Sequence, residues 1–328
     1  MQLVINTYGT YLHIKDELFE VRIKKDKKVE KHHFASQKVS SIMLSKGAAI
    51  STDAIILAMK NNIDIVVFEY DGQPVGRFWH SKLGSTSKIR KKQLEASINV
   101  DGMNYVKDWI GTKLNNQVEF LKRLKKHRVK IAEELDEKIA SINRLKIKIR
   151  ENIGDKTSME ADTIRGLEGT AGRIYFQTLS SLLSKQYQFD GRSFRPAKDP
   201  FNTFLNYAYG ILYSRVEKAL IIAGLDPYIG FMHRDDYNMK SMVFDFIEPY
   251  RIYADEVIFK LFSAKKINDA HCDKITNGYS LNAEGKNLLI KHFFKYFEED
   301  KIKYKGRNQS RANALQMDAH TFATELIK

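Results

Sequence analysis

The spacing of apolar residues along this chain of 328 residues changes once, near residue 83. Before that point, short runs rich in β-branched and aromatic residues alternate with polar positions, which is the period of a half-buried strand. After it, apolar residues recur every three or four positions, which is the period of a helix with one buried face. Because the two periods occupy separate stretches, the sequence predicts an α+β protein with its strands first and its helices after them.

Residues 1–83 are predicted to form a small N-terminal β-sheet domain. Ser51 precedes an apolar run and is typical of the start of a helix, here one that covers the sheet. Asp71 and Gly72 indicate a tight turn between the last two strands. The expected strands are 3–5, 18–23, 41–44, 65–68 and 75–78.

Residues 84–100 are expected to be a linker with a first helix, and 101–328 a larger all-α domain. A single helix over 101–150 would be about 75 Å long at roughly 1.5 Å per residue, so we expect two packed helices there. Further helices are expected at about 161–186, 199–223, 241–264, 280–299 and 309–327.

Basic residues are in excess, with 54 Lys and Arg against 40 Asp and Glu and a net charge of +14. This balance favours a polyanionic partner such as nucleic acid. Two basic clusters are candidates for contacts with DNA phosphates, although a solvated surface is an equally simple interpretation of each. One cluster lies within 107–150 and the other surrounds Tyr304. Their candidate residues are Lys122, Lys125, Lys126 and Arg128, and then Lys303, Lys305 and Arg307.

Several classes of protein are disfavoured by what the sequence lacks. Its single cysteine, Cys272, excludes an intramolecular disulfide and a cysteine-rich zinc site. It has no phosphate-binding loop of the Walker type and no nucleophile elbow, which weighs against nucleotide-dependent enzymes and serine hydrolases. It also has neither a long apolar run nor the features of a signal peptide. We therefore expect no membrane segment and a cytoplasmic location.

Glu168 and His233 are the first two candidates for chemistry. Glu168 is followed by Gly169, in a glycine-rich stretch that allows another chain or a ligand to approach closely. A solvated glutamate at a helix start is the competing interpretation. His233 ends an apolar stretch that follows a turn at 224–227. A histidine in such a place acts either as a ligand or as a hydrogen-bonded packing residue.

Asp245 and Glu248 form an acidic pair within an apolar segment, where a spacing of three places both on one helical face. Buried carboxylates are costly unless they are paired or bound to a metal. Arg251, three residues after Glu248, offers a salt bridge as the structural alternative. One imidazole with several carboxylates suits Mg²⁺ or Mn²⁺ better than a closed zinc site, because hard oxygen ligands dominate.

The most specific pattern is carried by five ordered segments, namely 165–176, 189–202, 205–210, 224–233 and 242–251. Together they closely resemble the CRISPR-associated adaptation endonuclease and integrase family, the Cas-one family, over nearly the whole chain. The resemblance implies an enzyme that joins the 3′-OH ends of captured DNA fragments into a CRISPR repeat array by metal-dependent transesterification. The larger domain would carry both catalysis and DNA binding.

The resemblance also implies which residues form the site. Glu168 and His233 correspond to metal ligands, and so does one or both of Asp245 and Glu248, with Mg²⁺ or Mn²⁺ as the cofactor. Between the last two, the family's arrangement gives a slight preference to Asp245 as the direct ligand. Other matching positions support the site or the DNA, and these are Arg192, Arg195, Asn206 and Tyr207.

The implied partners are double-stranded DNA, a second copy of the chain and a small second CRISPR adaptation protein in a prokaryotic cell. A protein that spans a captured fragment and a target duplex needs two symmetric sites, which favours a homodimer. By resemblance, the dimer would pair through the N-terminal β domains. Two other functions remain open. One is a structure-specific repair nuclease that acts on branched DNA, and the other is a non-catalytic DNA-binding scaffold.

Overall fold

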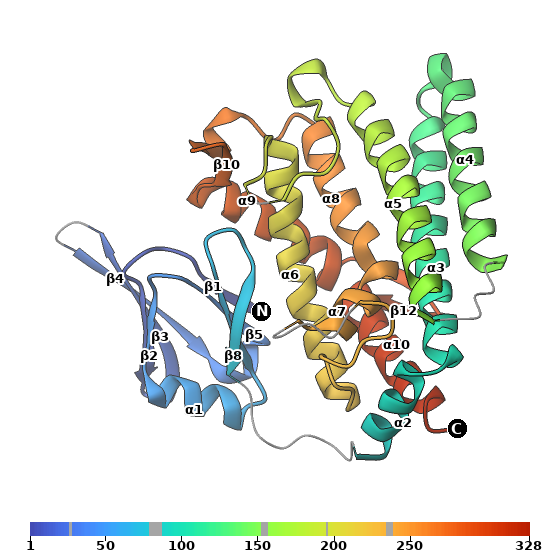
Figure 1. Cartoon of the computed structure of the whole chain (residues 1–328). Coiled ribbons are helices and arrows are strands. Elements are labelled where there is room, and N and C mark those ends of the chain that lie inside the picture. Colours follow the sequence, from blue (N-terminus) through green and yellow to red (C-terminus); the bar gives the residue numbers. More distant parts are fainter. Residues whose placement is uncertain (26–27, 79–86, 152–156, 195, 234–238) are drawn as a thin grey trace.

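The structure is a computed structural model that describes residues 1–25, 28–78, 87–151, 157–194, 196–233 and 239–328. Strands fill its N-terminal part and helices dominate the rest, so the predicted α+β class is confirmed (Figure 1). The expected boundary at residue 83 and the candidate Arg195 lie outside the described residues. Among the described helices, none combines the length and the apolar character needed to cross a membrane.

The N-terminal part contains two four-stranded sheets rather than the single sheet that was expected. The first has the order β1–β5–β7–β8, where β1, β5 and β7 are parallel and β8 is antiparallel to β7. The second has the order β4–β3–β2–β6. The strands are β1 (Gln2–Ile5), β2 (Tyr11–Lys15), β3 (Leu18–Lys25), β4 (Lys28–Ala35), β5 (Ser41–Ser45), β6 (Ala49–Ile50), β7 (Asp64–Phe68) and β8 (Pro74–Phe78).

All five expected strands are present, and the strands missed were β2, β4 and β6. β4 is exposed along most of its length, so its sequence carries little of the alternation that marks a half-buried strand. Helix α1 (Thr52–Lys60) begins as expected, since Ser51 Oγ accepts a hydrogen bond from the amide of Ala54 at 3.2 Å. A small core between the sheets contains the fully buried Leu12, Phe19, Ile42 and Ile65.

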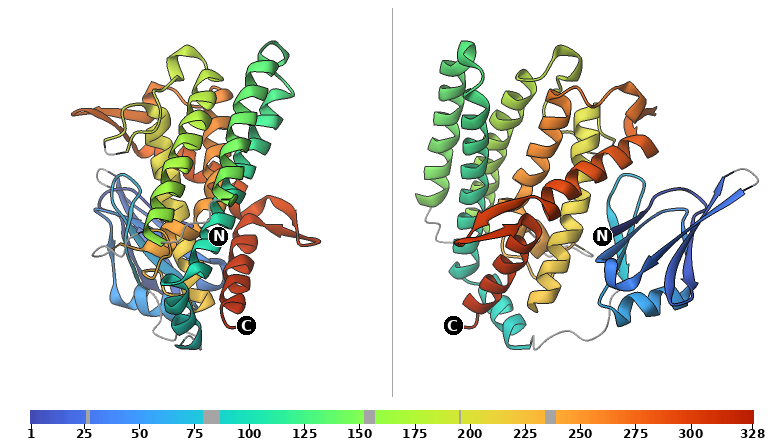
Figure 2. Two further views of the ribbon diagram at one scale, coloured as in Figure 1. Left: turned by 45° about the vertical axis from the view of Figure 1, so that its right-hand side comes forward. Right: turned by 180° about the vertical axis from the view of Figure 1, so that it is seen from behind.

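The helical part is built around α6 (Pro200–Ala223), most of whose side chains are buried. Asp199 caps its first turn, and Gly224 ends it with a φ of 87° that suits glycine. Figure 2 shows the long helices lying side by side. The other α-helices are α2 (Ser87–Ser97), α3 (Val100–Lys125), α4 (Ala132–Glu151), α5 (Thr157–Ser181), α7 (Ser241–Phe246), α8 (Arg251–Ser263), α9 (Ala283–Phe294) and α10 (Arg311–Glu325).

The expected pair of helices in 101–150 is confirmed by α3 and α4, but the helix expected over 241–264 is interrupted. After α7 the chain makes the short 3₁₀ turn η4 (Glu248–Tyr250) before α8 begins. Pro249 explains the interruption, because it supplies no amide hydrogen for a continuous helix. Asp245 and Glu248 therefore belong to different elements, which corrects the expectation that they share one helix.

The remaining short helical turns are η1 (Ser36–Lys38), η2 (Val129–Ile131), η3 (Lys185–Tyr187), η5 (Asp269–His271) and the short π-helix η6 (Lys295–Glu299).

Two small hairpins interrupt the region that was expected to be helical throughout. One pairs β9 (Cys272–Ile275) with β10 (Gly278–Leu281), and the other pairs β11 (Lys301–Tyr304) with β12 (Arg307–Ser310). The second has a two-residue turn in which Lys305 and Gly306 have φ angles of 45° and 79°. Positive φ at both positions is what a tight hairpin turn requires, and glycine adopts it readily.

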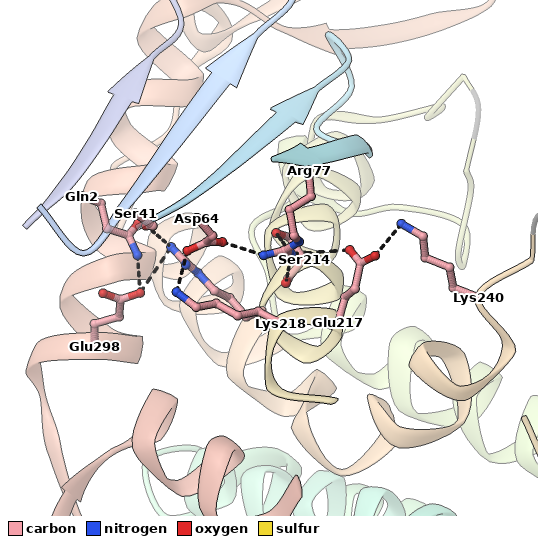
Figure 3. Close-up of polar contacts among 10 residues, drawn as sticks. Gln2, Ser41, Asp64, Arg77, Ser214, Glu217, Lys218, Lys240 and Glu298 are labelled. Carbon is pink, nitrogen blue, oxygen red and sulfur yellow. Dashed lines mark hydrogen bonds and ion pairs between the residues drawn. The ribbon is translucent and has the colours of Figure 1, made fainter. Parts of the chain in front are cut away.

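A network of charged residues joins the first sheet to α6 (Figure 3). Arg77 on β8 donates to Asp64 on β7 at 2.6 Å and to the carbonyl oxygen of Ser214 at 2.7 Å. Lys218 Nζ lies 2.5 Å from the other oxygen of Asp64. Burial alone would raise the pKa of Asp64, but Lys218 and Arg77 lower it by more, so the net pKa is below its ordinary value and the carboxyl stays ionised. The two parts are thus held together by a buried, paired charge.

The same network continues toward the segment before α7. One carboxylate oxygen of Glu217 lies 3.4 Å from Arg77 Nη2, and the other lies 2.8 Å from Lys240 Nζ. Figure 3 shows Glu217 between the two cations. The turn before β8 also packs against α6 with no space to spare, because a Cβ built on Gly210 would lie 1.8 Å from the carbonyl oxygen of Gly72. These contacts fix the sheet against the helices.

Candidate active site

A cavity of about 810 Å³ opens among α3, α5, α6 and the segments on either side of α7. Its lining includes three of the four predicted metal ligands, Glu168, His233 and Glu248. Basic side chains outnumber acidic ones around it, and the basic ones are Lys113, Arg165, Arg173, Arg192 and Arg251. Such a surface attracts anions, because the cavity walls concentrate the field of the charges that line them.

Glu168 lies in the middle of α5 and not at a helix start. Gly169 and Gly172 follow it on the cavity wall, and a Cβ added to either would meet no other atom within 4 Å. The surface beside Glu168 is therefore open, as the glycines suggested. The carboxylate itself is paired with the Lys113 ammonium, which reaches it from α3.

His233 is held by Asp245. The Asp245 carboxylate accepts hydrogen bonds from the amides of Phe231 at 2.6 Å and Met232 at 3.0 Å, and it lies 2.5 Å from His233 Nδ1. Gly230 permits this close approach, since a Cβ there would lie 3.0 Å from the same carboxylate and closer still to Ser241. With Nδ1 engaged, Nε2 is the ring nitrogen left for a ligand.

Glu248 is buried between two cations. Arg251 Nε donates to Glu248 Oε1 at 2.8 Å, which is the salt bridge expected as an alternative to metal binding. Lys113 Nζ lies 2.6 Å from Oε2, so each oxygen of the Glu248 carboxylate contacts a cation. Burial raises the pKa of Glu248, but Arg251 and Lys113 outweigh it and hold the pKa below its usual value.

Lys113 is the site residue that sequence reasoning missed, because it was counted only as one of many basic residues on 107–150. Its side chain is 9% exposed. Burial lowers its pKa, but Glu248 and Glu168 raise it more strongly, so the ammonium stays charged. One signal was available. Lys113 falls three residues after the buried Ile110 and one before the buried Leu114, on the apolar face of α3.

The supporting candidates divide between two places. Arg192 Nη2 donates to Asn206 Oδ1 at 2.8 Å, and Asn206 Nδ2 donates to the carbonyl oxygen of Phe194 at 2.9 Å. Arg192 is thereby fixed on the wall of the main cavity. Tyr207 does not line the main cavity; its ring lies against Gly72 and lines a second cavity of about 500 Å³, which Arg192 and Asn206 also line.

The two basic clusters lie away from the cavity lining. Lys122 pairs with Glu119 at 2.8 Å, and Lys125 with Asp136 at 2.6 Å. Lys122 is roughly 14 Å along α3 from Lys113. The other members of the clusters lie as follows: Lys126 is exposed, Arg128 donates to the carbonyl oxygen of Leu124, Lys303 and Arg307 are exposed on the β11–β12 hairpin, and Lys305 pairs with Asp318.

Within the described part of the chain, no group of three or more His, Cys, Asp and Glu side chains is arranged to hold a metal ion. The types of ligand nevertheless fit Mg²⁺ or Mn²⁺, because the carboxylates of Glu168 and Glu248 and the imidazole of His233 line one cavity. The buried Oε2 of Glu248 is also suited to a cation, since it already lies 2.6 Å from the ammonium of Lys113. The ammonium of Lys113 lies against both carboxylates.

Fold and cavity together define the class of the protein. Carboxylates and an imidazole inside a basic cavity are the groups that enzymes use to bind a phosphodiester and a catalytic divalent ion. Such a cavity suits an enzyme that acts on phosphodiesters, and comparisons with known proteins give the family.

The family described as CRISPR associated protein Cas1 matches residues 3–295. The CRISPR-associated endonuclease Cas1 1 of Archaeoglobus fulgidus is 32% identical over 97% of this chain and 94% of its own length. The CRISPR-associated endonuclease Cas1 2 of Saccharolobus solfataricus is 33% identical over 79% of this chain and 74% of its own length. The chain belongs to the Cas1 family, which confirms the resemblance found in its sequence.

Solved structures share the fold. A casposase bound to integration product aligns with a TM-score of 0.85 at 19% identity, covering 100% of this chain and 91% of that one. A Cas1 protein from Thermotoga maritima aligns with a TM-score of 0.82 at 24% identity, covering 100% and 97%. A chain of a Cas6-RT-Cas1–Cas2 complex aligns with a TM-score of 0.80 at 19% identity, covering 99% of this chain and 35% of that one.

Proposed function

We propose that this chain is a metal-dependent DNA endonuclease and integrase of CRISPR adaptation, which joins the 3′-OH ends of captured fragments into a repeat array by transesterification. The observation that carries the proposal is that Glu168, His233 and Glu248 line one basic cavity in a member of the Cas1 family. The fold shared with a casposase bound to its integration product supports the joining reaction.

In this proposal Glu168, Glu248 and His233 Nε2 are the metal ligands, and Asp245 is a positioning residue. The amides and the His233 ring that surround Asp245 already occupy its carboxylate, whereas Glu248 lines the cavity beside Glu168 and His233. A bound Mg²⁺ or Mn²⁺ would polarise the scissile phosphate and favour the alkoxide form of the attacking 3′-hydroxyl. No covalent intermediate with the protein is needed.

The arginines of the cavity are proposed to bind the phosphates that flank the reacting one. Arg192 is held in advance by Asn206 and by Asn202, so little side-chain freedom remains to be lost when DNA binds. Arg165 is likewise anchored, because it donates to the carbonyl oxygen of Met232 at 2.9 Å. Charged hydrogen bonds of this kind are strong and directional for phosphate.

We further propose that the protein acts as a homodimer on double-stranded DNA together with a small second adaptation protein. The supporting observation for that partner is the shared fold with a chain of a Cas1–Cas2 assembly. Two symmetric copies would supply the two sites that a fragment with two 3′ ends requires.

A joining assay tests the proposal. A labelled DNA fragment with free 3′-OH ends is incubated with plasmid DNA that carries a repeat, with Mg²⁺, Mn²⁺ or chelator, and with or without the small partner. Metal-dependent joining supports the proposal. Cleavage without joining would instead indicate a repair nuclease for branched DNA, and the absence of both reactions would indicate a scaffold.

The same assay includes Glu168→Gln. We expect this variant to lose joining and to retain nearly all DNA affinity, because affinity comes mainly from Lys and Arg side chains that bind phosphates. Glu119→Gln, which changes an exposed carboxylate of α3 outside the cavity lining, is the matched control and should join normally. Normal joining by Glu168→Gln would remove Glu168 from the catalytic site.

A further inference from the structure

Lys113 carries a buried charge that the proposed reaction does not use. Its ammonium contacts Glu168 on α5 and lies 2.6 Å from Glu248 on η4, so one side chain of α3 links the two proposed metal ligands. Those two acids are 80 positions apart in the sequence. A single cation between two carboxylates does what a metal ion would do there, since it offsets their mutual repulsion and fixes their separation.

The four charges that are paired with one another at this position cancel. Glu168 and Glu248 contribute two negative charges, while Lys113 and Arg251 contribute two positive ones. A divalent ion added to this arrangement would leave two uncompensated positive charges in a partly buried cavity, which is costly. Arg251 cannot easily leave, because Nη2 also donates to Tyr213 Oη at 3.0 Å. Lys113 ends in a compact ammonium on a flexible four-carbon stem, which can swing aside.

We propose that Lys113 is a tethered stand-in for the catalytic ion: it holds Glu168 and Glu248 in position when the ion is absent, and it must withdraw for the ion to bind. This inference rests on the proposed function and extends it. Lys113 acts through the two glutamates and is therefore a positioning residue. Only molecules in which the ammonium is withdrawn can bind the ion. The apparent dissociation constant for the metal is therefore the intrinsic one divided by the fraction of such molecules.

The test is the affinity for Mn²⁺, measured by calorimetry on the full chain without DNA. Lys113→Met keeps the length of the side chain and removes its charge. We expect its dissociation constant for Mn²⁺ to be lower than that of the wild type by at least about tenfold. Its melting temperature should fall in chelator and recover with Mn²⁺ by a larger increment than in the wild type, because the ion binds only the folded state.

Lys107→Met is the matched control. Lys107 is also on α3, is 12% exposed and pairs with the buried Glu160, but it does not line the cavity. Its loss should lower the melting temperature and leave the Mn²⁺ affinity unchanged. If Lys113→Met does not fold, Lys113→Gln provides a neutral side chain that can still hydrogen-bond to both carboxylates, and the same increase in affinity is expected.

The outcomes separate this inference from the proposed function. Tighter Mn²⁺ binding by the Lys113 variants alone supports the inference. Wild-type binding of Mn²⁺ with equal or weaker binding by the Lys113 variants overturns the role of Lys113 and leaves the metal-dependent function standing. If neither the wild type nor the Lys113 variants bind Mn²⁺, the inference fails together with the metal site, and joining in the presence of chelator would show this independently.

Discussion

Asp245 and Glu248 are three residues apart and have different neighbours. Asp245 turns back to the amides of Phe231 and Met232, and Glu248 turns to Lys113 and Arg251. A carboxylate that already accepts several amide hydrogens has few lone pairs left for an ion. Its remaining effect is to orient His233, and fixing the ring in this way also strengthens Nε2 as a ligand.

We therefore predict different results for Asp245→Asn and Glu248→Gln. Asp245→Asn should weaken Mn²⁺ binding by about 10 to 100-fold, which is the usual cost of losing a partner that orients a ligand. Glu248→Gln should abolish measurable Mn²⁺ binding, because it removes a ligand charge. Calorimetry with Mn²⁺ distinguishes them, and a greater loss in Asp245→Asn would reverse the two roles.

At the level of single residues, motif spacing identified Glu168, His233, Asp245 and Glu248 as candidates, and the structure places three of them on one cavity. Lys113 could not be found in this way, because its role depends on α3, α5 and η4 meeting in space. A sequence pattern shows that a lysine interrupts an apolar face, but it does not show which acids lie opposite. The same holds for Tyr207, whose motif suggested the site and whose ring faces Gly72 instead.

Among the elements, strands β2, β3 and β4 share a buried polar cluster. Glu20 on β3 is fully buried, and Arg22 Nε lies 2.5 Å from one of its oxygens. His13 Nε2 lies 2.8 Å from the same oxygen, and His33 Nε2 lies 2.6 Å from the other. The hydrogen bond from Arg22 lowers the pKa of Glu20, burial opposes it, and the two histidines lower it further, to about 2. Three neighbouring strands thus depend on one ionised carboxylate.

Glu20 should make the free energy of unfolding depend on pH in the acidic range. Its folded pKa of about 2 lies below its ordinary value of 4.5, so between these values the unfolded chain binds more protons and stability rises with pH. The contribution should be complete above about pH 4.5 and lost as the pH falls toward 2. We expect the difference in urea midpoint between wild type and Glu20→Gln to shrink over this range. Glu30→Gln, which alters an exposed carboxylate of β4, should show a small difference at every pH.

The basic residues at the end of α3 can be tested for contact with DNA. Replacing Lys122, Lys125, Lys126 and Arg128 with Gln should reduce the slope of log affinity against log salt by about 0.9 for each phosphate that the variant no longer neutralises. Sequence preference should not change, since phosphates carry no sequence information. Filter binding over a salt series measures the slope. An unchanged slope would assign this cluster to solvation and make Lys303 and Arg307 of the β11–β12 hairpin the next variants to measure.

Periodicity predicted the order and type of the long elements best where a helix has one buried face, as in α3 and α4. It failed where tertiary contacts or turn geometry decide the structure. The β11–β12 hairpin depends on positive φ at Lys305 and Gly306 and is too short to show a period. Strand β4 is largely exposed, so pairing with β3 rather than burial determines its form.

For the whole molecule, the contacts of Arg77 decide how firmly the sheet is attached to α6. Arg77→Met would remove one cationic partner from each of Asp64 and Glu217, which would keep their contacts with Lys218 and Lys240. Breaking a buried ion pair in this way costs about 3 to 5 kcal/mol. We expect a loss of that size in the free energy of unfolding, measured with urea. Lys92→Met, which breaks an exposed pair with Glu95, should cost no more than about 1 kcal/mol.

The position of Glu217 between Arg77 and Lys240 has a consequence for the exchange of parts between relatives. The strands and the helices look like separate modules in the sequence, yet the sheet contacts the side chains of Ser214, Glu217 and Lys218 on α6. Glu217 also reaches Lys240, in the segment that leads into α7. A chimera that takes residues 1–78 from a relative should keep its fold only if Ser214, Glu217 and Lys218 come from the same parent. A fusion made only at the boundary between the strands and the helices would join a sheet from one parent to an α6 from another, and the two sides of this interface would not match.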